Sequence, residues 1–233
     1  EHPYQQIPQF SPDGRSVAFV ADNNIYLKKL DYDTEVAVTT NGVKNSIING
    51  ATDWTYEEEF VSTSTLTWAP DSETLSYVSF DETDVPLYNI TLYQGTCEPK
   101  NEYALYPGQM SYKYPVAGAV NSTVTLHSYD VATRKTKDIQ LPDSEIEYIP
   151  RIDYASTAEQ LLVTTLNRDQ NRMEIYSVNP KSTVVKSLYV EESKAWIAPA
   201  TYENLVITPK SVIINSSRSG YSHLYEYSLA GAQ

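Results

Sequence analysis

A recurring pair of short strands constrains the fold of this chain more than any other feature. Apolar residues at positions one, three and six, with a turn-forming residue at position seven, occur in residues 25–31, 124–130 and 173–179, and more faintly in 224–230. After each of the first three copies come a polar turn and a second short strand, in residues 35–39, 136–141 and 184–190. Each such pair predicts a β-hairpin.

A turn followed by a strand precedes each hairpin. Phe-Ser-Pro-Asp-Gly at 10–14 and Trp-Ala-Pro-Asp-Ser at 68–72 are the clear copies, and residues 154–157 and 208–211 are weaker ones. Proline and aspartate favour a tight turn, and the 20 tyrosines favour strands. Four units of turn, strand, hairpin and strand are typical of β-propeller blades. A β-sandwich also uses many short strands and is the alternative.

We therefore predict an all-β fold in which residues 1–233 form one partial β-propeller of about four blades. Four blades lie at the lower end of the range that closes a propeller, so we expect an incomplete arc of a larger ring. No pattern of a long amphipathic helix is present, so we expect no α/β domain in this chain. The chain begins at Glu1 without methionine, which we interpret as the start of an excised segment.

Charge and cysteine content narrow the possible partners. The 17 basic and 30 acidic residues give a net charge of −13, so nucleic acid and anionic membrane surfaces are not expected partners, whereas cationic ligands are favoured. The sequence has no run of 18 apolar residues, so no membrane span is expected. Cys97 is the single cysteine and can form no intramolecular disulfide, and we interpret it as a free structural thiol.

The main candidate site is the segment 53–60, which reads Asp-Trp-Thr-Tyr-Glu-Glu-Glu-Phe. It places three carboxylates between aromatic residues, and partly desolvated carboxylates gain from a cation such as the α-amino group of a peptide. Neighbouring residues such as Glu58 and Glu59 do not converge on a regular strand or helix. We therefore expect irregular backbone here, in a loop or a single helical turn. The alternative is an acidic turn or a helix N-terminus that faces solvent.

Three ordered motifs resemble the dipeptidyl peptidase IV family: residues 53–60, Asp-Val-Pro-Leu at 84–87, and Tyr-Pro-Val-Ala-Gly-Ala-Val-Asn at 114–121. The resemblance implies an eight-bladed propeller that caps the α/β-hydrolase domain of a serine exopeptidase, which releases dipeptides from free N-termini. It also implies that Glu58 and Glu59 are the glutamate pair that anchors the substrate's N-terminus, and it suggests a periplasmic or secreted setting. After Trp196 and Ile197 the sequence departs from mammalian relatives, so we assign no second-subsite residues.

The segment 86–119, which runs from Pro86 to Ala119, is a long insertion that carries six tyrosines. Exposed aromatic surface of this size is often covered by a partner. The resemblance implies that this segment is an arm that contributes to a homodimer. The alternative is a loop that packs against its own blade.

The chain lacks the residues for peptide hydrolysis. A serine peptidase of this family needs a Gly-x-Ser-x-Gly elbow, and none of the 8 glycines frames one. His2, His127 and His223 are the only histidines, and His127 lies in an expected strand, where a structural role is favoured. We find no motif for a metal or a cofactor. We therefore expect this chain to be inactive alone and to act on peptides with a free N-terminus together with the hydrolase domain of its parent chain. A non-catalytic interaction module and a catalytically silent relative are the alternatives.

Overall fold

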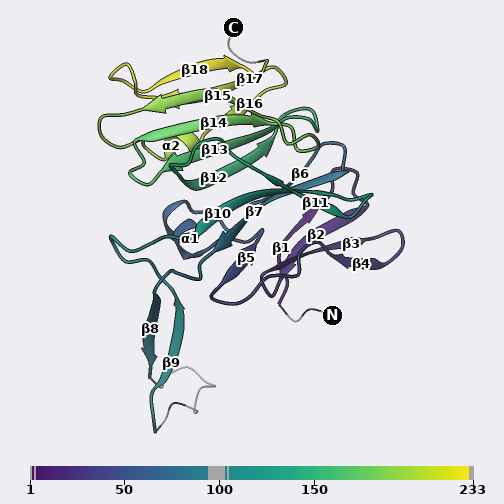
Figure 1. The fold of residues 1–233 in the computed structure, drawn as a ribbon, viewed down its shortest axis with the longest axis vertical. Coiled ribbons are helices and arrows are strands. Elements are labelled where there is room, and N and C mark those ends of the chain that lie inside the picture. The colour runs from purple at the N-terminus through teal and green to yellow at the C-terminus, as the bar shows by residue number, and fades with distance from the viewer. Residues whose placement is uncertain (1, 3, 94–102, 104, 231–233) are drawn as a thin grey trace.

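The computed structural model describes residues 2, 4–93, 103 and 105–230, and in these residues antiparallel sheets follow one another along the molecule (Figure 1). The first sheet has the order β1 (Gln6–Phe10), β2 (Ser16–Ala21), β3 (Asn24–Lys29) and β4 (Thr34–Ala37). The third has the order β12 (Ile146–Tyr154), β13 (Leu161–Asn167), β14 (Arg172–Val178) and β15 (Val185–Glu192). The fourth has the order β16 (Val206–Ile207), β17 (Ser211–Ser216) and β18 (His223–Ser228).

The second sheet is the most elaborate and carries the insertions. It contains β5 (Ile47–Asn49), β6 (Leu66–Trp68), β7 (Thr74–Asp81), β10 (Thr123–Asp130) and β11 (Lys135–Ile139). Its order is β11, β10, β7 and β5, and β6 also pairs with β7. Between β7 and β10, the ribbon of β8 (Leu87–Leu92) and β9 (Gly108–Lys113) projects from the body (Figure 1). Two short helices, α1 (Trp54–Glu59) and α2 (Ala200–Glu203), precede β6 and β16.

The predicted hairpins are confirmed. The three clear copies form the pairs β3–β4, β10–β11 and β14–β15, and the faint fourth copy forms β18. In the first and third sheets four strands run antiparallel in chain order, as in the blade of a propeller. The chain is therefore a partial β-propeller, as predicted from the repeats.

Two equivalent turns explain the recurring Pro-Asp motif. The Gly14 N–H bonds to the Ser11 carbonyl at 2.8 Å, and the Ser72 N–H bonds to the Ala69 carbonyl at 2.9 Å. Both residues adopt the left-handed region, with φ of 69° for Gly14 and 62° for Ser72. Glycine adopts this conformation freely, whereas serine is strained in it. The Ser72 hydroxyl accepts a hydrogen bond from the Asp13 N–H at 3.1 Å, which links the two turns.

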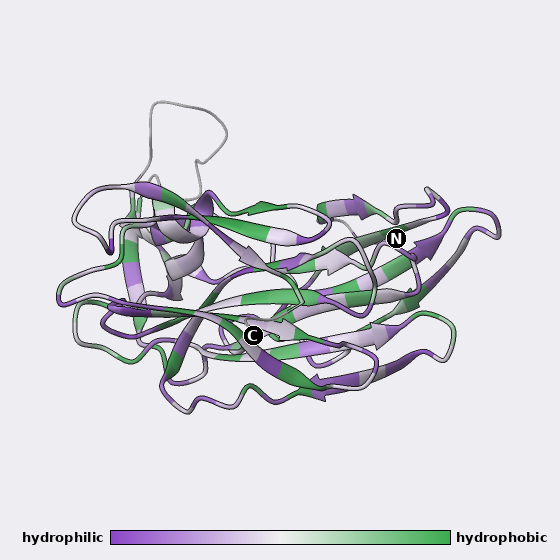
Figure 2. Cartoon of the chain, turned by 90° about the horizontal axis from the view of Figure 1, so that it is seen from above, coloured by the Kyte–Doolittle hydropathy of each residue, from purple (hydrophilic) through white to green (hydrophobic). Residues whose placement is uncertain are grey.

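The core lies between the sheets. Strands β7 and β13 are buried along almost their whole length because neighbouring sheets cover both of their faces. Figure 2 shows stretches of apolar residues, in green, along the strands. Buried side chains also bond from sheet to sheet, as between Ser76 and the Tyr154 hydroxyl at 2.7 Å. No helix in the described ranges is long and apolar enough to cross a membrane.

Candidate functional site

The acidic segment lies on an excursion from one side of the second sheet. Strands β5 and β6 lie end to end along the same side of β7, with β5 opposite Ser79–Asp81 and β6 opposite Leu75–Tyr77. Between them the chain leaves the sheet, and a single bridge between Ala51 and Ser64 closes the base of the excursion. Helix α1 therefore sits on a short loop whose two ends are both fixed in one sheet.

Asp53 starts helix α1 and joins it to Ser122, the residue before strand β10. It has an extended backbone, and its Oδ1 accepts a hydrogen bond from the Tyr56 N–H at 3.0 Å, as is typical of an N-cap. The Ser122 hydroxyl donates to Asp53 Oδ2 at 2.6 Å. Burial raises the pKa of Asp53, and the hydrogen bonds from Ser122 and the backbone oppose this rise. The first residue of the motif is thus a structural anchor.

The apolar face of the excursion is anchored in the core. The Tyr56 side chain is 1% exposed and packs edge-on against Phe80, with ring centroids 4.7 Å apart. Its hydroxyl accepts a hydrogen bond from the Ile149 N–H of β12 at 2.7 Å. The Phe60 ring packs edge-on against Tyr148 and against Tyr202 of α2, with ring centroids 5.3 and 5.9 Å apart. These rings hold α1 against the third sheet and against α2.

The three glutamates occupy the opposite, exposed side of this segment. Glu57, Glu58 and Glu59 are all exposed, and the last turn of α1 contains no basic residue. In the part of the chain that the structure describes, none of the three forms an ion pair. Partial burial raises the pKa of Glu57, and the carboxylates of Glu58 and Asp53 add to the rise. Among the described residues, the site is therefore a concentration of negative charge without a cationic partner.

The expectation of irregular backbone in this segment is wrong, because residues 54–59 form a regular short helix. The segment forms a helix of 6 residues, which is a short helical turn and not a strand. Neighbouring residues on a helix project about 100° apart around the axis, so Glu58 and Glu59 do not converge through the backbone alone. Their side chains extend into solvent, where a ligand of suitable charge could bring the two carboxylates together.

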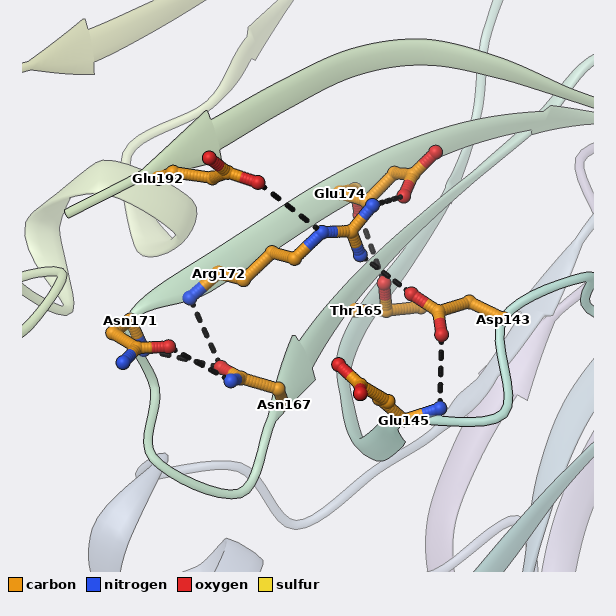
Figure 3. Close-up of polar contacts among 8 residues, drawn as sticks. All are labelled: Asp143, Glu145, Thr165, Asn167, Asn171, Arg172, Glu174 and Glu192. Carbon is orange, nitrogen blue, oxygen red and sulfur yellow. Dashed lines mark hydrogen bonds and ion pairs between the residues drawn. The ribbon is translucent and has the colours of Figure 1, made fainter.

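A second cluster of charged residues, shown in Figure 3, was not predicted from the sequence. Arg172 bonds to Asp143 at 2.5 Å, to Glu174 at 2.7 Å and, more loosely, to Glu192 at 3.7 Å. Glu174 is only 5% exposed, and the guanidinium of Arg172 balances its charge inside the protein. Arg172 and Glu174 are two residues apart on β14, but Asp143 is 29 residues from Arg172, and no local spacing signals that contact. These carboxylates already have a guanidinium partner, so the cluster is structural. Through Asp143, it joins the chain before β12 to strand β14 of the third sheet.

His127 has the structural role that was expected for it. One ring nitrogen, Nδ1, lies 2.9 Å from Asp138 Oδ1, and Nε2 lies 2.8 Å from the Thr125 hydroxyl. The ring stacks on that of Tyr77, with ring centroids 5.1 Å apart. These contacts join neighbouring strands on one face of the second sheet. Cys97 lies outside the described residues.

The arm stands away from the blades as a two-stranded ribbon, so it is not a loop packed along its own sheet (Figure 1). Tyr88, Tyr112 and Tyr114 form a ring cluster at its foot. Tyr114 also lies edge-on to Trp54 of α1, with centroids 4.2 Å apart. Residues 94–102 and 104 of the predicted arm lie outside the described residues. The foot of the arm is thus in direct contact with the acidic helix.

Comparison with known proteins agrees with the propeller architecture. The family model described as "Dipeptidyl peptidase IV (DPP IV) N-terminal region" matches residues 1–233. The crystal structure of Porphyromonas gingivalis dipeptidyl peptidase 4 is similar, with a TM-score of 0.92 and 45% identity over 100% of this chain and 32% of that chain. Among curated proteins, "Probable dipeptidyl-aminopeptidase B" of Aspergillus fumigatus is 30% identical over 243 residues, which are 96% of this chain and 26% of the relative.

A protein of the same name from Chaetomium globosum is 33% identical over 198 residues, which are 82% of this chain and 21% of the relative. The chain thus spans about a quarter of the length of the curated relatives that it matches.

Proposed function

Because this chain belongs to the family of the dipeptidyl peptidase IV N-terminal region, we propose that it is the propeller part of a dipeptidyl peptidase IV-like serine exopeptidase. In this proposal Glu58 and Glu59 bind the free α-amino group of a peptide, and the propeller controls which substrates reach the active site. The hydrolase domain of a longer parent chain supplies the catalytic serine. The family resemblance also favours a periplasmic or secreted setting.

The division of residues 53–60 into a buried and an exposed side carries this proposal. Asp53 and Tyr56 are held by hydrogen bonds to other elements, whereas the glutamates are exposed. Consecutive carboxylates repel one another, and at the C-terminal end of a helix they also face its unpaired carbonyl groups. A cation relieves both effects. An α-ammonium group offers three N–H donors, enough to bond to two carboxylates at once.

A rigid anchor for the N-terminus also accounts for the release of dipeptides. If the ammonium group is fixed at Glu58 and Glu59, the peptide bond after the second residue lies at a constant distance from the anchor. The anchor then contributes orientation and leaves the chemical step to the serine. A peptide whose N-terminus is blocked, or a bond far inside a chain, would not be positioned in the same way.

The test is made in the full-length enzyme with the single variants Glu58→Ala and Glu59→Ala. Each is expected to lower kcat/KM for a dipeptide substrate by about ten- to a hundredfold, because a charge-assisted hydrogen bond contributes about 1.5 to 3 kcal/mol. Turnover of a small ester without an amino group should change much less. Wild-type peptide turnover in both variants would contradict the proposal.

The protruding ribbon supports a second proposal, that the arm contributes to a homodimer. Tyr88, Tyr93 and Tyr106 are 48%, 75% and 80% exposed on this segment. Such aromatic side chains are enriched at the centre of protein interfaces. Replacing residues 89–111 with a two-residue Asn-Gly turn, which keeps Tyr88 and Tyr112 of the foot, should convert a dimer into a monomer in light scattering, and an unchanged mass would rule out this use of the arm. A pure interaction module would keep this interface but show no dependence of any peptidase activity on Glu58 or Glu59.

A further inference from the structure

The first turn of helix α1 is held by two residues of the return segment, which we define as residues 114–122, after the ribbon β8–β9. Tyr114 lies edge-on to Trp54 with ring centroids 4.2 Å apart, and the Ser122 hydroxyl donates to Asp53 at 2.6 Å. Asp53 and Trp54 are neighbours at the start of the helix. The return segment therefore contacts the helix at both of its own ends, 8 residues apart in the sequence.

The return segment is in turn fixed to the third sheet. The Asn121 side chain donates to Glu147 Oε1 and to the Tyr148 hydroxyl, both at 2.8 Å. Arg168 bonds to the same Glu147 oxygen at 2.8 Å and to the Ala119 carbonyl at 2.5 Å. The C-terminal part of the segment is thus held by several polar contacts, whereas its N-terminal part, at Tyr114, depends on aromatic packing.

Tyr114 belongs to the ring cluster at the foot of the arm. Its ring lies 5.4 Å from Tyr88 and 6.2 Å from Tyr112, which are on the two strands of the ribbon. Its backbone N–H bonds to the Pro86 carbonyl at 3.0 Å, where the ribbon begins. A change in the direction of the ribbon therefore moves this ring, and the ring lies against the helix that carries the glutamates.

We propose that Tyr114 is a positioning residue for Glu58 and Glu59, and that its contact with Trp54 makes the affinity for a peptide's ammonium group depend on the conformation of the arm. This inference rests on the proposed amine-binding role of the two glutamates. Tyr114 touches no substrate in this account. It acts by fixing the orientation of the short helix, which has few backbone hydrogen bonds of its own.

The test compares Tyr114→Ala with Tyr114→Phe and Tyr32→Ala in the full-length enzyme. An edge-on aromatic contact is modest, so Tyr114→Ala is expected to raise KM for a free-amine dipeptide substrate about two- to tenfold, with the turnover of a small ester unchanged. Tyr114→Phe keeps the ring and should behave as wild type. Tyr32 is 72% exposed in the turn between β3 and β4, outside the arm, so Tyr32→Ala should also behave as wild type.

A second variant removes the same contact without touching the arm. Trp54→Leu should give the same rise in KM, and the double variant Trp54→Leu with Tyr114→Ala should cost no more than either single change, because both act through one contact. Amide hydrogen exchange of residues 54–60 should be faster in both variants. Unchanged KM and exchange in Tyr114→Ala, an equal effect of Tyr32→Ala, or an equal loss of ester turnover would each overturn the inference.

Loss of amine binding and loss of the positioning contact give different results. If Glu58→Gln and Glu59→Gln leave KM unchanged, the amine-binding proposal itself is wrong. If those variants raise KM and Tyr114→Ala does not, only the positioning role of Tyr114 is wrong.

Discussion

The Tyr56 hydroxyl accepts a hydrogen bond from the backbone N–H of Ile149 at 2.7 Å, across 93 residues of sequence. This contact joins the acidic helix of the second sheet to the first strand of the third. Both partners are almost fully buried, with 1% of each residue exposed. The exposed glutamates are therefore carried by a helix whose other side belongs to the core.

Replacing Tyr56 with phenylalanine should destabilise the fold. The Ile149 N–H would lose its acceptor inside the core, and an unsatisfied buried donor costs about 1 to 3 kcal/mol in the free energy of unfolding. Urea unfolding followed by fluorescence measures the change. Tyr221 is 78% exposed, so Tyr221→Phe is the control and should stay within about 0.5 kcal/mol of wild type. Equal stability of both variants would mean that the Ile149 N–H finds another partner.

Replacing Ser122 with alanine should cost more stability at neutral than at acidic pH. Burial raises the pKa of Asp53 above its ordinary value. The free energy of unfolding therefore falls as pH rises through the folded pKa, because the buried carboxyl group then has to ionise. The Ser122 hydroxyl offsets this by bonding to the carboxylate, and its loss should cost about 1.5 to 3 kcal/mol at pH 7. Ser128 donates to the Pro180 carbonyl at 2.9 Å, so Ser128→Ala should show a loss that does not vary with pH.

Glu82 makes the wild-type protein less stable as the solution becomes more alkaline. Burial raises the pKa of Glu82 to about 7, the Asp53 carboxylate adds to the rise, and Lys113 opposes it. Because the folded pKa lies above the unfolded one, stability is full below the unfolded pKa and falls as pH rises through 7. Glu82→Gln should therefore be more stable than wild type at pH 8, by about 1 to 3 kcal/mol, and similar at pH 4.

The control for Glu82 is the exposed neighbour Asp84. Asp84→Asn removes one exposed negative charge near Glu82 and should not reproduce the gain in stability that Glu82→Gln shows at pH 8. If Glu82→Gln also leaves the stability between pH 5 and 8 unchanged, the Glu82 carboxyl is ionised in the folded protein at a much lower pH than this account requires.

Removing Arg172 should leave a buried carboxylate without a partner. Arg172→Met is expected to destabilise the fold by about 2 to 4 kcal/mol, because Glu174 is 5% exposed and loses its guanidinium. The double variant Arg172→Met with Glu174→Gln should recover part of that loss, which a double-mutant cycle of unfolding free energies measures. A double variant that is as unstable as the sum of the singles would show that the two side chains do not interact.

The blades could be predicted from the sequence because their signal is local. Alternating apolar residues and Pro-Asp turns recur at each unit, and residues 10–14 and 68–72 indeed form equivalent turns. The acidic segment was expected as a loop or a single helical turn, and Asp53 is a residue type that commonly starts a helix. The ribbon β8–β9 was expected as an inserted arm, but its two strands were not.

The partners that hold the site could not be predicted. Ile149 lies 93 residues from Tyr56, and Ser122 lies 69 residues from Asp53. The split of one inner strand into β5 and β6, with the helix between them, depends on pairing along β7 that no local pattern encodes. The cluster around Arg172 brings together Asp143 and Glu192, which are also far apart in the sequence. In each case tertiary contacts determine the arrangement.

The most direct test is a thermodynamic cycle of kcat/KM values that combines changes to the glutamates with removal of the substrate's amino group. In the full-length enzyme, kcat/KM is measured for a dipeptide substrate and for its analogue without the amino group, with wild type, Glu58→Gln, Glu59→Gln and the control Glu57→Gln. We expect Glu58→Gln and Glu59→Gln to lower kcat/KM about ten- to a hundredfold for the free amine and hardly at all for the analogue, with a much smaller effect of Glu57→Gln. Equal losses on both substrates, or none on either, would contradict the central claim that these carboxylates bind the amino group.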